Sequence, residues 1–129
     1  MLNDPLSNVL SHVENCERIG RNEAVVKPIS KLILKVLEIM KDGLYIGSYE
    51  QINNGRGGLI KINLIGKINR CNVIKPRLSF TYKNIEKFEK RFLPAKDFGI
   101  IIVSTNNGLM THAKAKENKL GGKLIAFIY

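Results

Sequence analysis

Residues 98–108 read FGIIIVSTNNG, and this stretch decides how the second half of the chain is interpreted. The apolar run Ile100–Val103 predicts a buried strand, because a short apolar run bounded by turn residues is typical of one. The run stops abruptly in two hydroxyls, two carboxamides and a glycine. A surface turn would explain Asn107 and Gly108, but it does not explain Ser104 and Thr105 at the end of so apolar a strand. The alternatives are simple turn chemistry and a cluster of small polar groups that contact a ligand.

The rest of the second half is expected to be mostly β. Proline and glycine residues divide it into short segments, and the periodicity of each segment predicts its structure. In order, these are a β-like run that Pro76 interrupts (70–82), a short polar helix or turn (84–92), the apolar strand, a short helix that Thr111 could cap (111–119), a tight turn at Gly121-Gly122 and a last strand (123–129).

The first half predicts two helices and three strands, because helical apolar stripes alternate with β-rich runs. Asn-Gly and Gly-Gly between the last two runs indicate a hairpin. In order, the elements are a helix that begins at Asp4-Pro5 and ends at Gly20, a strand (23–28), a helix that Ser30 caps and Gly43 ends, and the two strands of the hairpin (44–52 and 59–68).

The predicted fold class is therefore α+β. An N-terminal α-β-α-β-β half, residues 1–66, is expected to pack against a C-terminal β-rich half, residues 67–129, with one or two short helices. At 129 residues, of which 44% are apolar, the chain suffices for one compact domain or for two small halves that share a core.

The charge balance indicates a polyanionic partner. The chain has 21 Lys and Arg against 11 Asp and Glu, a net charge of +10, and such an excess on a small chain is typical of nucleic-acid-binding proteins. The alternative is a basic domain without such a partner. An anionic membrane surface is not favoured, because no segment combines a basic face with a continuous apolar face.

The sequence contains no catalytic or metal-binding pattern. His12 and His112 are far apart, and both are expected at the surface. Cys16 and Cys71 lack a metal-ligand spacing and predict two small buried thiols in a reducing compartment, with a disulfide as the alternative. We therefore expect no enzymatic activity and no cofactor. Because the sequence shows neither a signal peptide nor a membrane span, we expect a cytoplasmic protein.

Several segments together resemble the ribosomal protein eight family of the small subunit, in its archaeal and eukaryotic form. They include KPISKL, IMKDGLYIGSYE, LIGKINRCNVIKPR and FLPAKDFGIIIVSTNNGLMTH, and LGGKLIAFIY at the end. The pairing of the VSTNNG and LGGKL motifs is the most specific feature. The resemblance implies a primary binder of the small-subunit rRNA that holds an irregular helix of the central domain. It also implies a role in platform assembly and contacts with neighbouring small-subunit ribosomal proteins.

By the same resemblance, the main RNA contacts lie in the second half, at the VSTNNG loop and the following Gly-Gly segment. A second patch lies near the N-terminus and at PISK. The RNA-binding residues implied are Ser104, Thr105, Asn106, Asn107, Gly108, Gly121, Gly122, Lys123, Asn3, Asp4, Ser30 and Lys31, and the positive charge of the β-like run adds Arg77 as a candidate.

One position departs from the family pattern. The third loop position is usually Ser or Thr, whereas here it is Asn106. Its carboxamide also donates and accepts hydrogen bonds, but the side chain is longer than that of Ser or Thr.

Two other functions are alternatives to the structural one. The first is a translational repressor that binds an rRNA-like site on its own messenger RNA. The second is a basic hydrolase or transferase, which the lack of any nucleophile–base grouping opposes.

Overall fold

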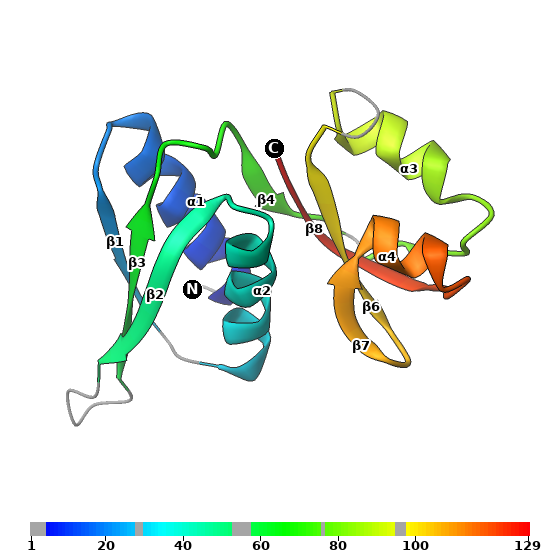
Figure 1. The fold of residues 1–129 in the computed structure, drawn as a ribbon, viewed down its shortest axis with the longest axis horizontal. Coiled ribbons are helices and arrows are strands. Elements are labelled where there is room, and N and C mark those ends of the chain that lie inside the picture. Colours follow the sequence, from blue (N-terminus) through cyan, green and yellow to red (C-terminus); the bar gives the residue numbers. More distant parts are fainter. Residues whose placement is uncertain (1–4, 28–29, 53–57, 76, 95–97) are drawn as a thin grey trace. The chain divides into compact units, whose positions relative to one another are not determined.

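The chain forms two compact units, Met1–Cys71 and Asn72–Tyr129. Over the described residues it has four helices and eight strands, arranged as two sheets (Figure 1). Each unit mixes helices with antiparallel strands, so the predicted α+β class is confirmed. The computed structural model describes residues 5–27, 30–52, 58–75, 77–94 and 98–129.

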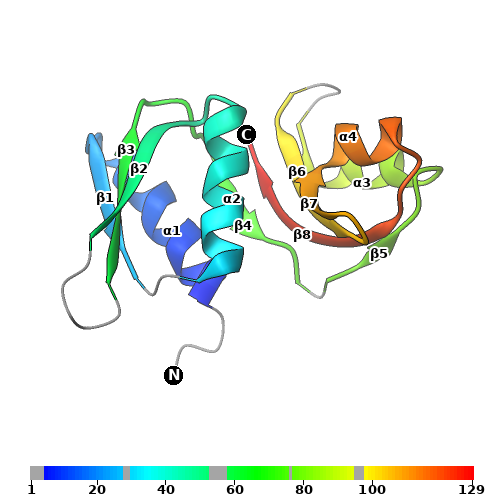
Figure 2. The ribbon, with the colours of Figure 1, turned by 60° about the horizontal axis from the view of Figure 1, so that its bottom comes forward.

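The first unit has the predicted order α-β-α-β-β. Its elements are α1 (Pro5–Arg18), β1 (Glu23–Val26), α2 (Lys31–Asp42), β2 (Ile46–Ile52) and β3 (Leu59–Leu64). The strands form an antiparallel sheet in the order β1-β3-β2, and α1 and α2 pack against it (Figure 2). The tip of the predicted hairpin, 53–57, and the Asp4 cap lie outside the described residues.

Apolar stripes on the two helices supply the core of this unit. The α2 helix begins as predicted, because the Ser30 hydroxyl accepts a hydrogen bond from the Ile33 N–H (3.2 Å). Strand β1 buries alternate residues and exposes Glu23 and Val25 on the other face of the sheet. Each fully buried aliphatic side chain contributes about 1.5–3 kcal/mol. The buried helix residues are Leu6, Val9, Leu10, Val13 and Cys16 on α1 and Ile33, Val36, Leu37 and Met40 on α2.

The segment after β3 is held along α1. The Glu17 carboxylate accepts hydrogen bonds from the backbone N–H groups of Gly66 (3.3 Å) and Ile68 (3.0 Å). Because backbone donors need partners wherever they leave a sheet, one α1 carboxylate fixes the path of the chain here.

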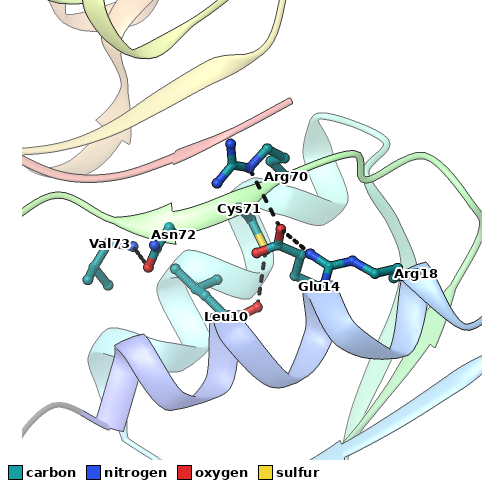
Figure 3. Close-up of polar contacts among 7 residues, drawn as sticks. All are labelled: Leu10, Glu14, Arg18, Arg70, Cys71, Asn72 and Val73. Carbon is teal, nitrogen blue, oxygen red and sulfur yellow. Dashed lines mark hydrogen bonds and ion pairs between the residues drawn. The ribbon is translucent and has the colours of Figure 1, made fainter.

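Cys71 is the last residue of this unit, and its side chain is buried against α1 (Figure 3). Its Sγ donates to the Leu10 carbonyl oxygen (3.3 Å). Nearby, Arg70 Nε lies 3.9 Å from Glu14 Oε1. Burial, together with the negative charges of Glu14 and Glu17, raises the pKa of the Cys71 thiol to about 12. The thiol is therefore neutral and unreactive in the folded protein.

The second unit contains two helices and a five-stranded sheet. Its elements are β4 (Cys71–Val73), β5 (Ser79–Phe80), α3 (Ile85–Phe92), β6 (Ile100–Thr105), β7 (Gly108–Thr111), α4 (His112–Glu117) and β8 (Gly122–Ile128). The strand order is β4-β8-β6-β7, with β5 also paired to β8. The first residue of β4 is the last residue of the first unit.

Three features of this unit differ from the sequence-based expectation. Ser104 and Thr105 belong to β6 rather than to a loop, and an additional strand, β7, pairs with them. Gly122 is the first residue of β8 rather than part of a turn. All three follow from backbone pairing between strands, which the apolar pattern of a single segment does not reveal.

Helices α3 and α4 cover one face of the second sheet (Figure 2). His112, expected at the surface, is 5% exposed, so that prediction is wrong. Its Nδ1 accepts a hydrogen bond from the Ile101 N–H (3.0 Å), and its Nε2 lies 3.3 Å from Glu89 Oε1 of α3. Because Nδ1 accepts, Nε2 must carry the proton and donate to Glu89. The core on this face contains Ile74, Phe80, Ile85, Leu93, Ile101, Val103, Met110, Ala115 and Leu124.

Three helices end in the same arrangement, in which the second residue after the helix adopts positive φ. At α1 this residue is Gly20 (φ 80°), at α2 it is Leu44 (φ 64°) and at α4 it is Lys119 (φ 56°). In each case two backbone N–H groups bond back to the last turn, as in a Schellman motif. The predicted C-cap Gly43 has φ −80°, so the left-handed conformation after α2 is adopted by Leu44, which carries a side chain.

Candidate nucleic-acid interface

The VSTNNG stretch forms the tip of the β6–β7 hairpin. Thr105 pairs with Gly108, and Asn106 and Asn107 form the two-residue connection. Gly108 has φ +104°, a conformation that favours glycine. Among the described residues other than glycine, only Leu44 and Lys119 have positive φ, so both asparagines have ordinary backbone angles. The carboxamides of both asparagines are exposed, and Gly108 is the residue of this turn that adopts positive φ.

Thr105 holds this turn together. Its hydroxyl donates to the Gly108 carbonyl oxygen (3.0 Å) and accepts from the Asn107 N–H (3.2 Å). The same oxygen lies 3.9 Å from Met110 Sδ, which belongs to the core. The Thr105 hydroxyl is therefore engaged within the hairpin.

Ser104 lies on the opposite face of the sheet from Thr105, because successive strand residues alternate. It pairs with Lys123 of β8, and Lys123 pairs with Ser79 of β5. Residues in register on adjacent strands share a face, so these three side chains form one row. Ser79 and Lys123 are exposed and Ser104 is half-buried. Within the described part of the chain, neither serine hydroxyl has a hydrogen-bond partner and the Lys123 ammonium has no ion pair.

We call Ser79, Lys123 and Ser104 the polar row. The adjacent row, Phe80–Gly122–Thr105, points to the helix-covered face, where Phe80 is buried in the core. The end of the sheet thus separates a structural face from a face that offers two hydroxyls and an ammonium.

The two glycines at the start of β8 allow strands to approach one another closely. A Cβ on Gly122 would lie 1.9 Å from the Ser104 carbonyl oxygen, and one on Gly121 would lie 2.9 Å from the Phe80 carbonyl oxygen. Neither glycine has positive φ. Both positions therefore require glycine because of the protein's own backbone, and they bring β5, β8 and β6 into register.

Sequence reasoning missed Ser79 and Lys119 as individual candidates. Ser79 lies in a run that Pro76 interrupts, and its register with Lys123 cannot be read from the apolar pattern. Lys119 is exposed and lies two residues before Gly121, where its positive φ ends α4. Arg77 is exposed, and its neighbour Leu78 accepts a hydrogen bond from Leu124 N–H (2.9 Å), so Arg77 lies next to the start of β8.

The other candidates lie in the first unit. Ser30 is the N-cap of α2, with its hydroxyl engaged by Ile33, and Lys31 is exposed in the first turn. They belong to the first unit, whereas the polar row belongs to the second. Asn3 and Asp4 lie outside the described residues.

The described residues show no catalytic or metal-binding arrangement. No three of their His, Cys, Asp and Glu side chains are grouped so as to hold a metal ion. His12 is exposed, as expected, and His112 is used in packing. Cys16 and Cys71 are buried free thiols, as predicted. In the described part of the chain, no helix has the length and apolar character needed to cross a membrane.

A basic α+β chain with exposed hydroxyls and ammonium groups at a sheet end has the character of a structural nucleic-acid-binding protein. The family model of ribosomal protein S8 matches residues 4–129, and the chain belongs to this family. It is therefore a small-subunit ribosomal protein that binds rRNA, not an enzyme, and it acts in the ribosome in the cytoplasm. The predicted family is confirmed, while the archaeal–eukaryotic branch stays a prediction.

Proposed function

We propose that the protein holds an irregular helical segment of the central-domain rRNA with the end of its second sheet, and thereby helps to assemble the platform of the small subunit. The observation that carries this proposal is the polar row, Ser79–Lys123–Ser104, on three adjacent strands. Its hydroxyls and ammonium point away from the helix-covered core.

The chemistry of the polar row suits RNA better than duplex DNA. Irregular RNA exposes base edges and 2′-hydroxyls, and a serine hydroxyl can donate to or accept from either. An ammonium between two hydroxyls adds attraction to the phosphate next to those groups without fixing sequence. Because all three residues stand on paired strands, little backbone entropy is lost when the RNA binds, and the short serine side chains have few rotamers to lose.

Residues around the polar row extend this surface. The carboxamides of Asn106 and Asn107 stand at the hairpin tip, where they can contact base edges in the place of the usual family hydroxyl. Arg77, beside the start of β8, and Lys119, just after α4, supply phosphate contacts. Gly108, Gly121 and Gly122 contribute through the backbone geometry that they permit. The N-terminal patch of Asn3, Asp4, Ser30 and Lys31 is proposed as a second contact, in which Lys31 carries the charge.

The test compares Ser104→Ala and Ser79→Ala with Thr105→Val. Binding to a central-domain rRNA fragment and to an unrelated hairpin is measured across a salt series. Each serine substitution is expected to cost on the order of 1–3 kcal/mol on the rRNA fragment alone, with an unchanged salt slope. Thr105→Val is expected to lower the free energy of unfolding, because the turn loses its internal hydrogen bonds, while the folded variant keeps its RNA preference. Unchanged preference in both serine variants would refute the proposal.

Repression of the protein's own message is a second role for the same surface. The polar row recognises local RNA shape, so a messenger RNA segment with the same irregular helix would bind equally well. Competition between that message segment and the rRNA fragment tests this. Ser104→Ala is expected to weaken binding to both RNAs by a similar factor, and unweakened message binding would separate the two roles.

A further inference from the structure

The face of the first sheet that α1 and α2 leave uncovered has a composition unlike the rest of this basic chain. Register places Val25, Lys61 and Glu50 in one row across the three strands. Glu23 pairs with Asn63 in the next row, and Asn63 Nδ2 donates to Ser48 Oγ (2.7 Å). We call this surface the open face of the first sheet.

Apolar side chains are concentrated on the open face. Val25 is 47% exposed, Ile52 39% and Ile65 46%. Ile52 shares the face because it pairs with Leu59, two residues from Lys61. Ile65 shares it because a Cβ on Gly47 would touch both Ile65 Cγ2 (3.2 Å) and Asn63 Cβ (3.5 Å). Three of the six most exposed large apolar side chains in the described residues therefore lie together, which is typical of an interaction surface.

The centre of the open face is a hollow of about 390 Å³ between strands, lined by Glu23, Ser48, Tyr49, Glu50, Lys61 and Asn63. Lys61 Nζ lies 3.4 Å from Glu23 Oε1, so its charge is already matched. Glu50 has no ion pair among the described residues. The hollow thus offers one unmatched carboxylate, next to the hydrogen-bonded side chains of Asn63 and Ser48, in a chain whose net charge is +10.

From these contacts we propose that the open face binds a protein segment that places a Lys or Arg side chain in the hollow beside Glu50 and apolar side chains on Val25 and Ile52. A carboxylate opposes an RNA phosphate, whereas it complements a guanidinium or ammonium group. Exposed aliphatic side chains add contact area for a protein and contribute little to a charged RNA backbone. The charge and the apolar content of the face favour the same occupant.

The test uses intact small subunits assembled with the full chain. Ile52 is replaced by a photoreactive benzophenone amino acid, and the cross-linked product is identified by mass spectrometry. The expected product is a peptide of another small-subunit protein that contains Lys or Arg next to an apolar residue. A cross-link to rRNA, or no cross-link, overturns the proposal.

A charge reversal provides the matched comparison. Adding Glu50→Lys to the photoreactive chain is expected to lower the cross-link yield roughly tenfold, because like charges then meet in the hollow. Glu38→Lys makes the same charge change on the exposed side of α2 and is expected to leave the yield unchanged. Equal yields in the two variants contradict the proposal. Binding of each variant to the isolated rRNA fragment verifies folding and is independent of the open face.

Discussion

Ser104 and Thr105 are neighbours in the sequence, but their hydroxyls serve different parts of the molecule. Thr105 bonds to the hairpin backbone, whereas Ser104 stands in the polar row with Lys123 and Ser79. The sequence identified both as candidates because the apolar strand ends there. It could not assign them to opposite faces, because the strand was expected to end at Val103, and alternation applies only where pairing continues.

Gly122 provides a residue-scale prediction about strand spacing. Gly122→Ala is expected to lower the free energy of unfolding by at least ~3 kcal/mol, because the new Cβ would sit 1.9 Å from a backbone oxygen that cannot rotate away. Gly108→Ala meets no neighbouring atom and is expected to cost about 1–2 kcal/mol through its positive φ alone. Urea unfolding of both variants measures the difference. Equal losses would mean that β6 and β8 are not so closely spaced.

The raised pKa of the buried Cys71 thiol predicts that the free energy of unfolding falls as the pH rises in the alkaline range. Burial raises the pKa of its thiol from 9.0 to about 12 in the folded protein. The unfolded chain therefore loses this proton at lower pH than the folded chain does. The contribution of the thiol to the free energy of unfolding is fully present below pH 9 and decreases above it. The decline is about 1.4 kcal/mol per pH unit between pH 9 and 12.

The measurement compares wild type with Cys71→Ala in urea at pH 8, 9 and 10. Because lysines and tyrosines titrate in the same range, the informative quantity is the difference between the two proteins. Cys71→Ala is less stable at pH 8, since it loses packing, and its disadvantage is expected to shrink as the pH rises. A constant difference would show that the thiol ionises equally in both states.

At the scale of elements, the helices and most strands could be predicted from the sequence. The α1 and α2 stripes and the Ser30 and Thr111 caps are local signals, and all four were confirmed. Strand β7 was missed because its four residues have no apolar alternation of their own and form a strand by pairing with β6. His112 was misplaced for a similar reason, since its burial depends on α3 and β6, which are distant in sequence.

The ends of α2 and α1 allow a direct test of helix termination. Leu44 is 73% exposed and has φ 64°, so its side chain contributes backbone strain and little packing. Leu44→Gly is expected to raise the free energy of unfolding by about 1 kcal/mol. Gly20→Ala, at the equivalent position of α1 with no atom nearby, is expected to lower it by a similar amount. Thermal unfolding measures both, and a destabilised Leu44→Gly would contradict the strain argument.

Lys119 occupies the equivalent position after α4, next to the proposed RNA surface. Lys119→Gly is expected to make the protein more stable by about 1 kcal/mol, yet to weaken binding to all RNAs and to reduce the salt slope by about one unit. Leu44→Gly is the control, because it relieves the same strain without removing a charge. If Lys119→Gly left RNA affinity unchanged, Lys119 would not be a phosphate contact.

At the scale of the whole molecule, net charge and the family-specific segments were sufficient to predict an rRNA-binding ribosomal protein, and the match over residues 4–129 confirms it. They were not sufficient to predict which candidate residues have a structural role and which ones are free to contact RNA. Gly121 and Gly122 are conformational requirements of the sheet, Ser30 is a helix cap, and Ser79 becomes a candidate through register alone. Such roles depend on which strands lie side by side.

Binding of the central-domain rRNA by the polar row, at the end of the second sheet, is the proposal from which the other RNA predictions follow. It is tested most directly by amide chemical-shift mapping of the labelled protein, titrated with the rRNA fragment. The largest changes are expected at Ser79, Ser104, Asn106 and Lys123, and no change is expected on the open face of the first sheet, at Val25 and Glu50. Largest changes on that open face, with the polar row unmoved, would contradict the proposal.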